Sequence, residues 1–349
     1  MGIFKKIAVG VCLILATVSA AAADYKLIVP QKVGGGTSVW ASIVAKELEK
    51  YLDEPVVLVH LPSARDIGGF NDFHNVDQFD DKTIMVSHGG NGVSFLQEDV
   101  DYNYADYDSI GLMNLNIIVG KRQGDNLQKV RFAAGSGMVP EAFAITMLLC
   151  GQATYEQYLA CFGHRVVWVN GMSGGERRLA FKRGELNATR ENPAAYKKHV
   201  EGDEKAEIWF HHGILDSNGL HRDDPNYEGY QFEQLFWNRW GQYPNGDFYD
   251  AYKLVKSFRD GMQKALWVRR GNPNRDKLVA ALEQVATNPE SVAAIEAKVG
   301  KYDWLIGDRG NAHRDGLMTL ITPEALYTLV KFNIEALGLD SIYKENLLD

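Results

Sequence analysis

Four short glycine-rich stretches are the residues whose types and spacing could bind a ligand. They read "GGGTS" (34–38), "HGGNG" (88–92), "GSG" (135–137) and "NGMSGG" (170–175), and each follows an apolar run. Glycine lets the backbone approach a ligand closely, and a helix N-terminus presents unpaired N–H groups and a positive dipole end. Together these features predict a cradle for an anion, with carboxylate as the simplest ligand, phosphate as the competitor and ordinary turns as the alternative.

The sequence lacks the common phosphate-binding and zinc-helix motifs. It contains no Gly-x-x-x-x-Gly-Lys-[Ser/Thr], no Gly-x-Gly-x-x-Gly and no His-Glu-x-x-His. His211 and His212 are adjacent, so their side chains point in different directions and we expect no shared metal site. His88 stands at the end of an apolar run, where packing or hydrogen bonding is a more common role for histidine than catalysis.

Strands and helices alternate along the first part of the chain. Apolar runs at 25–29, 55–60 and 82–89 are expected strands. The segment 37–52 has apolar side chains at every fourth position and begins with two hydroxyl residues, which favours a helix with one of them as N-cap. Such alternation predicts a parallel sheet with helical crossovers.

The same pattern starts again further along the chain. Strands are expected at 116–122 and 129–137, and 164–190 reads as strand, glycine turn, helix and strand. The apolar segment 264–273 precedes further helices. The sequence therefore predicts an α/β fold of two lobes, each with a mainly parallel sheet, and a cleft ligand at the carboxyl ends of the strands.

The first 23 residues have the features of a secretory signal peptide. Lys5 and Lys6 precede an apolar segment at 7–18, and small residues at 19–23 permit cleavage before Asp24. The apolar segment is shorter than the roughly 20 residues of a spanning helix, and an uncleaved anchor is the alternative. We expect an exported, periplasmic protein.

The amino-acid composition of the chain limits the classes of partner that it can bind. The formal net charge is −8, and 46% of the 349 residues are hydrophobic. Such a chain can form a large core, and it lacks the basic excess that nucleic-acid binding requires.

Two of the three cysteines, Cys150 and Cys161, remain after cleavage of the signal peptide. An oxidising compartment would allow a disulfide between them, worth roughly 2–3 kcal/mol for so short a loop. Two buried free thiols are the alternative.

The order of these features resembles the tripartite tricarboxylate transporter substrate-binding proteins, also called the Bug family. The matching stretches are "PQKVGGGTSVWA" (30–41), "PSARDIGG" (62–69), "VRFAAGSGM" (130–138) and "VVWVNGMSGGERRLAFKRGELNAT" (166–189). The resemblance implies a two-lobed receptor with the type II periplasmic binding-protein fold, and we expect it to be a monomer. Such a receptor has no cofactor and delivers a small mono-, di- or tricarboxylate to a two-component membrane permease.

Carried over residue by residue, the resemblance assigns ligand contacts to the glycine turns. The first-lobe contacts are Gly35, Gly36, Thr37 and Ser38, with Gly90 and Asn91 from the "HGGNG" turn. The second-lobe contacts are Ser136, Gly137, Asn170, Gly171, Ser173 and Gly174.

The sequence departs from the family at the expected mouth of the cleft. Ser38 stands where many members carry an acidic residue, and the loop 62–69 has gained Arg65 and Asp66. These changes make the site less negative, so Arg65 is a candidate partner for a ligand carboxylate, with Arg190 as a second candidate. A surface pair between Arg65 and Asp66 is the alternative.

The implied division of the chain is a first lobe at 24–118 and 268–349, a second lobe at 119–267, and hinge strands near 116–121 and 265–270. The aromatic segment 209–252 either caps the cleft or contacts the permease.

Two other functions of the protein stay open. One is an exported α/β enzyme, such as a hydrolase that uses His88, and the other is a binding protein that signals to a membrane partner.

Overall fold

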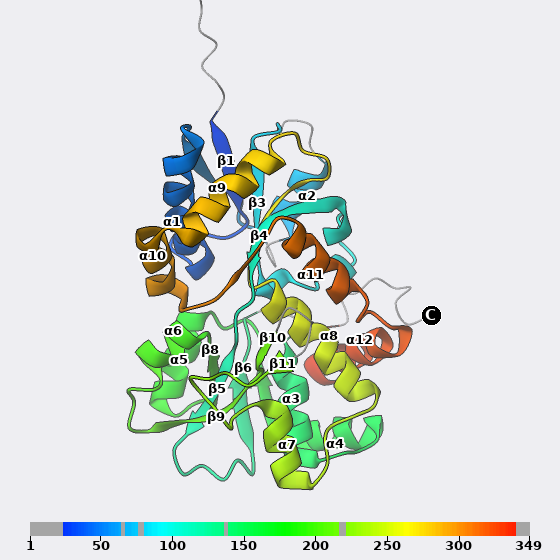
Figure 1. Cartoon of the computed structure of the whole chain (residues 1–349). Helices are drawn as coiled ribbons and strands as arrows, with labels where there is room; N and C mark the ends of the chain where they lie inside the picture. The colour runs from blue at the N-terminus through cyan, green and yellow to red at the C-terminus, as the bar shows by residue number, and fades with distance from the viewer. Residues whose placement is uncertain (1–23, 64–66, 76–79, 136–138, 216–220, 340–349) are drawn as a thin grey trace, which may run out of the picture.

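The computed structural model describes residues 24–63, 67–75, 80–135, 139–215 and 221–339. The chain forms two α/β lobes, one above the other in Figure 1, and passes from the first lobe to the second and back. The predicted two-lobed α/β fold is therefore confirmed. Within the described ranges, no helix is long and apolar enough to cross a membrane.

The first lobe is built on a six-stranded sheet. Its order is β13 (Trp304–Ile306), β4 (Tyr107–Met113), β12 (Lys264–Arg269), β3 (Thr83–His88), β1 (Tyr25–Val29) and β2 (Val56–His60). Strand β1 runs parallel to β2 and β3, whereas β12 runs antiparallel to β3 and β4, and β13 runs antiparallel to β4.

The second lobe has smaller sheets. Strand β5 (Ile118–Arg122) lies antiparallel between β8 (Ala188–Glu191) and β9 (Ala206–His211). Two further pairs are β6 (Val130–Ala133) parallel to β7 (Val166–Val169), and β10 (Ile214–Leu215) antiparallel to β11 (His221–Arg222). The prediction of mainly parallel sheets is wrong, because strands such as β12 return from the other lobe and enter the sheet from the opposite end.

Helices surround both sets of strands. The first lobe has α1 (Gly36–Leu52), α2 (Gly68–Asn75), α9 (Arg275–Thr287), α10 (Pro289–Val299), α11 (Asp308–Met318) and the short 3₁₀ helices Gly89–Asn91, Ser94–Leu96 and Tyr104–Asp106. The second lobe has α3 (Pro140–Cys150), α4 (Tyr155–Arg165), α5 (Gly174–Arg183), α6 (Pro193–His199), α7 (Phe232–Trp240) and α8 (Asp247–Gly261). The predicted apolar face of α1, Trp40, Val44, Leu48 and Leu52, is buried as expected.

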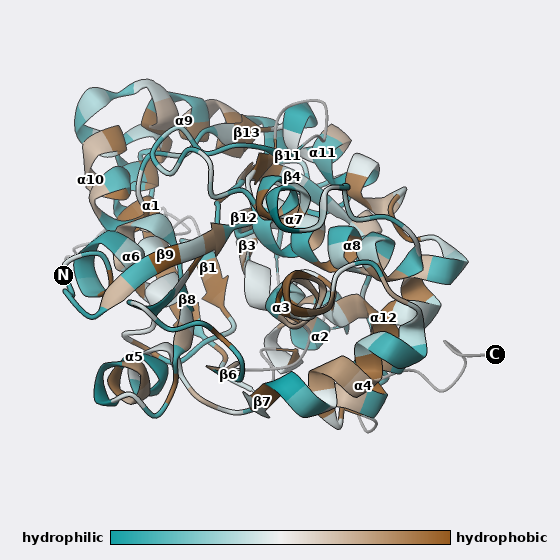
Figure 2. Ribbon diagram, turned by 90° about the horizontal axis from the view of Figure 1, so that it is seen from below, coloured by the Kyte–Doolittle hydropathy of each residue, from teal (hydrophilic) through white to brown (hydrophobic). Residues whose placement is uncertain are grey.

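The last helix, α12 (Pro323–Leu337), packs on the second lobe. The Phe332 ring lies 4.7 Å from that of Phe143, 5.3 Å from Phe162 and 4.9 Å from Phe248. Figure 2 shows the hydrophobic helix α3 among α4, α8 and α12. Residues 323–337 therefore pack with the second lobe, although the sequence placed 268–349 in the first.

Three short segments connect the two lobes in the described part of the chain. Residues 114–117 lead from β4 to β5, residues 262–263 lead from α8 to β12, and residues 319–322 lead from α11 to α12. The expected hinge strand at 265–270 overlaps β12, which is paired on both sides in the first-lobe sheet. The division into lobes remains a prediction, with its proposed crossings now at 114–117, 262–263 and 319–322.

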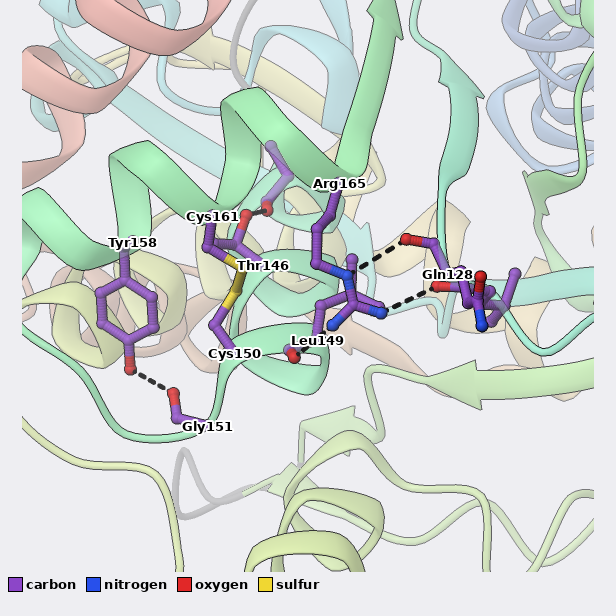
Figure 3. The surroundings of a disulfide bond; sticks show 10 residues. Gln128, Thr146, Leu149, Cys150, Gly151, Tyr158, Cys161 and Arg165 are labelled. Atoms are coloured by element: carbon purple, nitrogen blue, oxygen red, sulfur yellow. Dashed lines mark hydrogen bonds between the residues drawn. A yellow bond between two sulfur atoms is a disulfide. The ribbon is translucent and has the colours of Figure 1, made fainter.

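Cys150 and Cys161 are joined by a disulfide between the end of α3 and α4, as Figure 3 shows. Their Cα atoms are 6.4 Å apart. Beside the disulfide, Arg165 donates a hydrogen bond of 2.9 Å to the Leu149 carbonyl. The covalent bond and this hydrogen bond fix α4 against the end of α3.

Candidate ligand-binding site

Two of the predicted turns, one from each lobe, line the same cavity. The cavity has a volume of about 760 Å³. Its lining residues are Gln31, Lys32, Gly35, Gly36, Pro62, Ser63, Ser173 and Gly174. None of these eight residues is acidic, so the wall that they form favours an anion.

Helix α1 presents its N-terminus to this cavity. The helix begins at Gly36, with Gly35 as N-cap in an extended conformation (φ −65°, ψ 161°). Gly34 has a φ of +85°, which glycine adopts without strain. Among the residues that the structure describes, no side chain caps this end and no acidic residue stands in its first turn. The positive end of the helix dipole is thus left for a ligand.

Thr37 and Ser38 are buried in the first turn of α1, so the prediction that one of them is the N-cap is wrong. Ser38 Oγ lies 2.8 Å from His60 Nε2 and accepts a 3.3 Å hydrogen bond from the Gly34 amide. The Ser38 side chain therefore holds the turn to the end of β2. Thr37 Oγ1 accepts a hydrogen bond of 2.9 Å from Lys264 Nζ.

Lys264 is not among the lining residues, but it contacts the first turn of α1, and the sequence reasoning missed it. It is the first residue of β12 and pairs in register with His88 at the end of β3 and Met113 at the end of β4. It is only 9% exposed, and burial lowers the pKa of its ammonium to about 7. The one signal in the sequence was a lysine directly before the apolar residues 265–268.

The "HGGNG" turn follows β3 and is held by its own hydrogen bonds. His88 Nδ1 accepts from the Gly90 amide at 3.0 Å, and Asn91 Oδ1 accepts from the His88 amide at 3.1 Å. His88 Nε2 lies 2.8 Å from the side-chain nitrogen of Gln31, a lining residue. A Cβ on Gly89 would lie 2.1 Å from a carbonyl oxygen of α8, so this glycine serves close packing. Gly90 and Asn91 are not among the lining residues.

Ser173 lies on the cavity as the N-cap of α5. Its hydroxyl accepts from the Glu176 amide at 3.4 Å, and its amide donates to Glu176 Oε2 at 2.8 Å. Residues 171–175 also match Gly-x-Ser-x-Gly, a pattern of hydrolase nucleophiles that sequence reasoning overlooked. Ser173 has ordinary extended angles (φ −62°, ψ 162°), and no histidine in the described part of the chain is hydrogen-bonded to it. It is a helix cap here.

Asn170 and Gly171 precede this cap and are not lining residues. The Asn170 side chain donates to the Leu337 carbonyl at 3.0 Å and accepts from Trp168 Nε1 at 2.9 Å. It connects the turn to the end of α12. Gly171 has a φ of +86°, which glycine adopts without strain, so the turn requires glycine at this position.

Arg190 lies in a largely buried network of charges. Its Nη1 is 3.3 Å from Glu141 Oε1, and Arg259 donates to both Glu141 oxygens at 2.7 and 3.0 Å. Arg177 donates to the Arg190 carbonyl at 3.0 Å and lies 3.8 Å from Glu191. Burial lowers the pKa of Arg177. Arg190 is therefore paired within the protein, and Glu141, Arg177 and Arg259 are charged neighbours that the sequence did not reveal.

Three predicted ligand contacts, Arg65, Ser136 and Gly137, lie outside the described residues and remain predictions. A second cavity, of about 750 Å³, lies between α9, α10 and β13, and none of the predicted contacts lines it. The described ranges hold no cluster of three or more side chains suited to a metal ion.

No protein-family model matches this sequence, and neither does any curated protein. Solved structures do share its fold. A TctC solute-binding protein from Polaromonas aligns with a TM-score of 0.53 and 15% identity over 86% of this chain and 99% of that chain. The periplasmic binding protein BugD aligns at 0.56 and 15% over 89% and 97%. An R. palustris protein with adipate aligns at 0.57 and 11% over 92% and 98%.

The chain thus has the fold of the periplasmic solute-binding proteins. Within that class, its structural relatives include the TctC and Bug proteins, and the resemblance noted in the sequence is confirmed at the level of the fold.

Proposed function

We propose that this protein is an extracytoplasmic receptor that binds a small organic carboxylate between its two lobes. One observation carries the proposal. The N-cap and first residue of α1, Gly35 and Gly36, line the same cavity as the N-cap and first residue of α5, Ser173 and Gly174. Each helix start offers N–H groups and a positive dipole end, so one anion between them would interact favourably with both.

The two helix starts contribute unequally. In α5, the Glu176 carboxylate already accepts a hydrogen bond from Ser173 and partly neutralises that end. In α1, the first turn has no acidic residue among those described. The ligand charge is therefore expected to lie nearer Gly36, with the second lobe adding hydrogen bonds as it closes.

Ligand binding would bring the two lobes of the receptor together. A ligand that contacts both lobes binds the closed arrangement more tightly and shifts the equilibrium towards it. The signal-peptide features of residues 1–23 and the fold support a periplasmic location. Delivery to a two-component membrane permease is the expected next step.

The rival function is an exported hydrolase. Two serine–histidine contacts are present among the described residues. Ser257 Oγ lies 3.1 Å from His221 Nε2, and Ser38 Oγ lies 2.8 Å from His60 Nε2, but Ser257 is only 2% exposed and Ser38 only 4%. His221 Nδ1 has no hydrogen-bond partner among the described residues, so no carboxylate orients this imidazole. His88 Nδ1 is engaged by its own turn. These contacts favour a receptor over an enzyme.

The test is a titration of the mature chain from residue 24 onwards, purified natively and also after unfolding and refolding. Mass spectrometry of the native sample identifies any retained acid. Adipate, succinate, citrate and inorganic phosphate are then titrated while tryptophan fluorescence and melting temperature are followed. A saturable response to a carboxylate, without its turnover, is the expected result. A folded sample that ignores all three carboxylates, or that consumes one, would contradict the proposal.

A further inference from the structure

Lys264 differs from the other buried cations of the protein. Among the described residues, four other lysine or arginine side chains are at least nine-tenths buried: Arg177, Lys256, Arg259 and Arg314. Each lies within ion-pair distance of a carboxylate, which belongs to Glu191, Glu233, Glu141 and Asp315 respectively. Lys264 has instead the neutral hydroxyl of Thr37 as its side-chain partner in the described part of the chain. A buried charge without a counter-charge is costly.

The surroundings of Lys264 increase that cost. Thr37 is the second residue of α1, so the ammonium lies beside the positive end of the helix dipole, which repels it. The residues opposite in the sheet, His88 and Met113, carry no negative charge. Asp260, four residues earlier in the chain, is bonded to His212 at 2.8 Å. An anion at the start of α1 would compensate both the ammonium and the dipole.

We propose that Lys264 supplies the positive counter-charge for a carboxylate of the bound ligand. The inference rests on the proposed function and deepens it. The site would hold an ionised acid through a charge-assisted hydrogen bond and discriminate against neutral isosteres such as amides. Lys264 directly follows the crossing segment 262–263, and Thr37 directly follows the lining residue Gly36. The negative charge of the ligand would thus be recognised where the two lobes join.

The protonation of the Lys264 side chain supports its role as the counter-charge. Burial lowers the Lys264 pKa to about 7, and a neighbouring carboxylate would raise it again, because an opposite charge favours the charged form. Ligand binding above pH 7 is therefore expected to take up a proton. The charged or titratable groups nearest in register and sequence are His88, Arg259 and Asp260, and the last two are already paired with Glu141 and His212.

The test compares Lys264→Met and Lys264→Arg with Lys129→Met, a control at an exposed lysine that does not line the cavity. Met is apolar and of similar length, so Lys264→Met is expected to fold. Its affinity for adipate and citrate should fall by at least about tenfold, as the loss of a charge-assisted hydrogen bond predicts, whereas Lys129→Met should change little. Lys264→Arg should retain part of the affinity because it keeps the charge.

Calorimetry at pH 8 in buffers of different ionisation enthalpy supplies a second readout. Wild type should take up a proton on binding and Lys264→Met should not. If Lys264→Met binds both acids as wild type does, with the same proton uptake, the inference is overturned.

If wild type binds neither acid, the proposed function has failed, and a separate experiment then tests whether Lys264 belongs to an anion site. Melting temperatures are then compared in sulfate and chloride of equal ionic strength at pH 6. A larger gain from sulfate in wild type than in Lys264→Met would support Lys264 as an anion site for another ligand. Equal gains would overturn it.

Discussion

The ammonium nitrogen of Lys264 lies 2.9 Å from the hydroxyl oxygen of Thr37, although the two residues are 227 positions apart in the sequence. The contact joins the start of β12 to the first turn of α1, the helix whose N-terminus lines the interlobe cavity. The positive charge of the proposed site therefore depends on a contact between two segments that lie far apart in the sequence.

Removal of this buried charge should change how stability depends on pH. The Lys264 pKa is about 7 in the folded protein and near 10.5 in the unfolded chain. Between these values the unfolded chain binds more protons, so stability contributed by this group rises with pH and is lost as pH falls towards 7. From pH 7 to pH 9, wild type should gain about 2 kcal/mol relative to Lys264→Met. Urea unfolding of both proteins measures this, and parallel pH profiles would contradict the assigned burial.

A bulky side chain at the start of α1 should block the cavity without unfolding the protein. In the described structure, nothing lies within 4 Å of a Cβ placed on Gly36, and the residue is helical. Gly36→Leu should keep the folding free energy within about 1 kcal/mol of wild type and abolish the fluorescence response to carboxylates. Gly163→Leu on α4, which is equally open, is the control and should bind normally. Normal binding by Gly36→Leu would place the ligand elsewhere.

Neutralising Glu141 should be severe, because it faces two arginines inside the protein. Glu141 is fully buried and accepts from Arg259 and Arg190. Glu141→Gln should lower the unfolding free energy by about 3–5 kcal/mol, since it leaves buried cations without a counter-charge. Glu185→Gln in the exposed pair with Arg183 should cost less than about 1 kcal/mol. Similar effects of both changes in urea unfolding would refute the role given to the buried network.

The first glycine of the "HGGNG" turn should not tolerate a side chain. A Cβ on Gly89 would lie 2.1 Å from the Arg259 carbonyl oxygen, so Gly89→Ala should destabilise by about 1–3 kcal/mol through overpacking. Gly175→Ala in α5 meets open space and should be neutral or stabilising by up to about 1 kcal/mol. Thermal melts rank the two. A stable Gly89→Ala protein would show that the turn and α8 can separate.

The disulfide should stabilise the second lobe and leave ligand affinity unchanged. Cys150 and Cys161 are 11 residues apart, and neither lines the cavity. The double change to serine should cost roughly 2–3 kcal/mol of unfolding free energy. Carboxylate affinity should stay at the wild-type value, and reductant should have no further effect on the variant. A large loss of affinity would connect α3 and α4 to the site.

The sequence predicted the local features of the site better than its long-range contacts. Apolar spacing fixed the helix of Trp40 and Leu48, and the glycines marked the starts of α1 and α5. Those signals are local, since turns and helix starts are encoded by neighbouring residues. The pairing of Arg190 with Glu141, the packing of α12 on the second lobe and the partner of Lys264 all depend on tertiary contacts. No spacing rule encodes such contacts.

The most direct measurement is the crystal structure of the protein with the acid that the titration identifies. A carboxylate group between the backbone amides of Gly36 and Gly174, with Lys264 Nζ within hydrogen-bond distance, is the predicted result. An acid bound in the cavity between α9, α10 and β13, or bound without contact to both α1 and α5, would contradict the interlobe receptor.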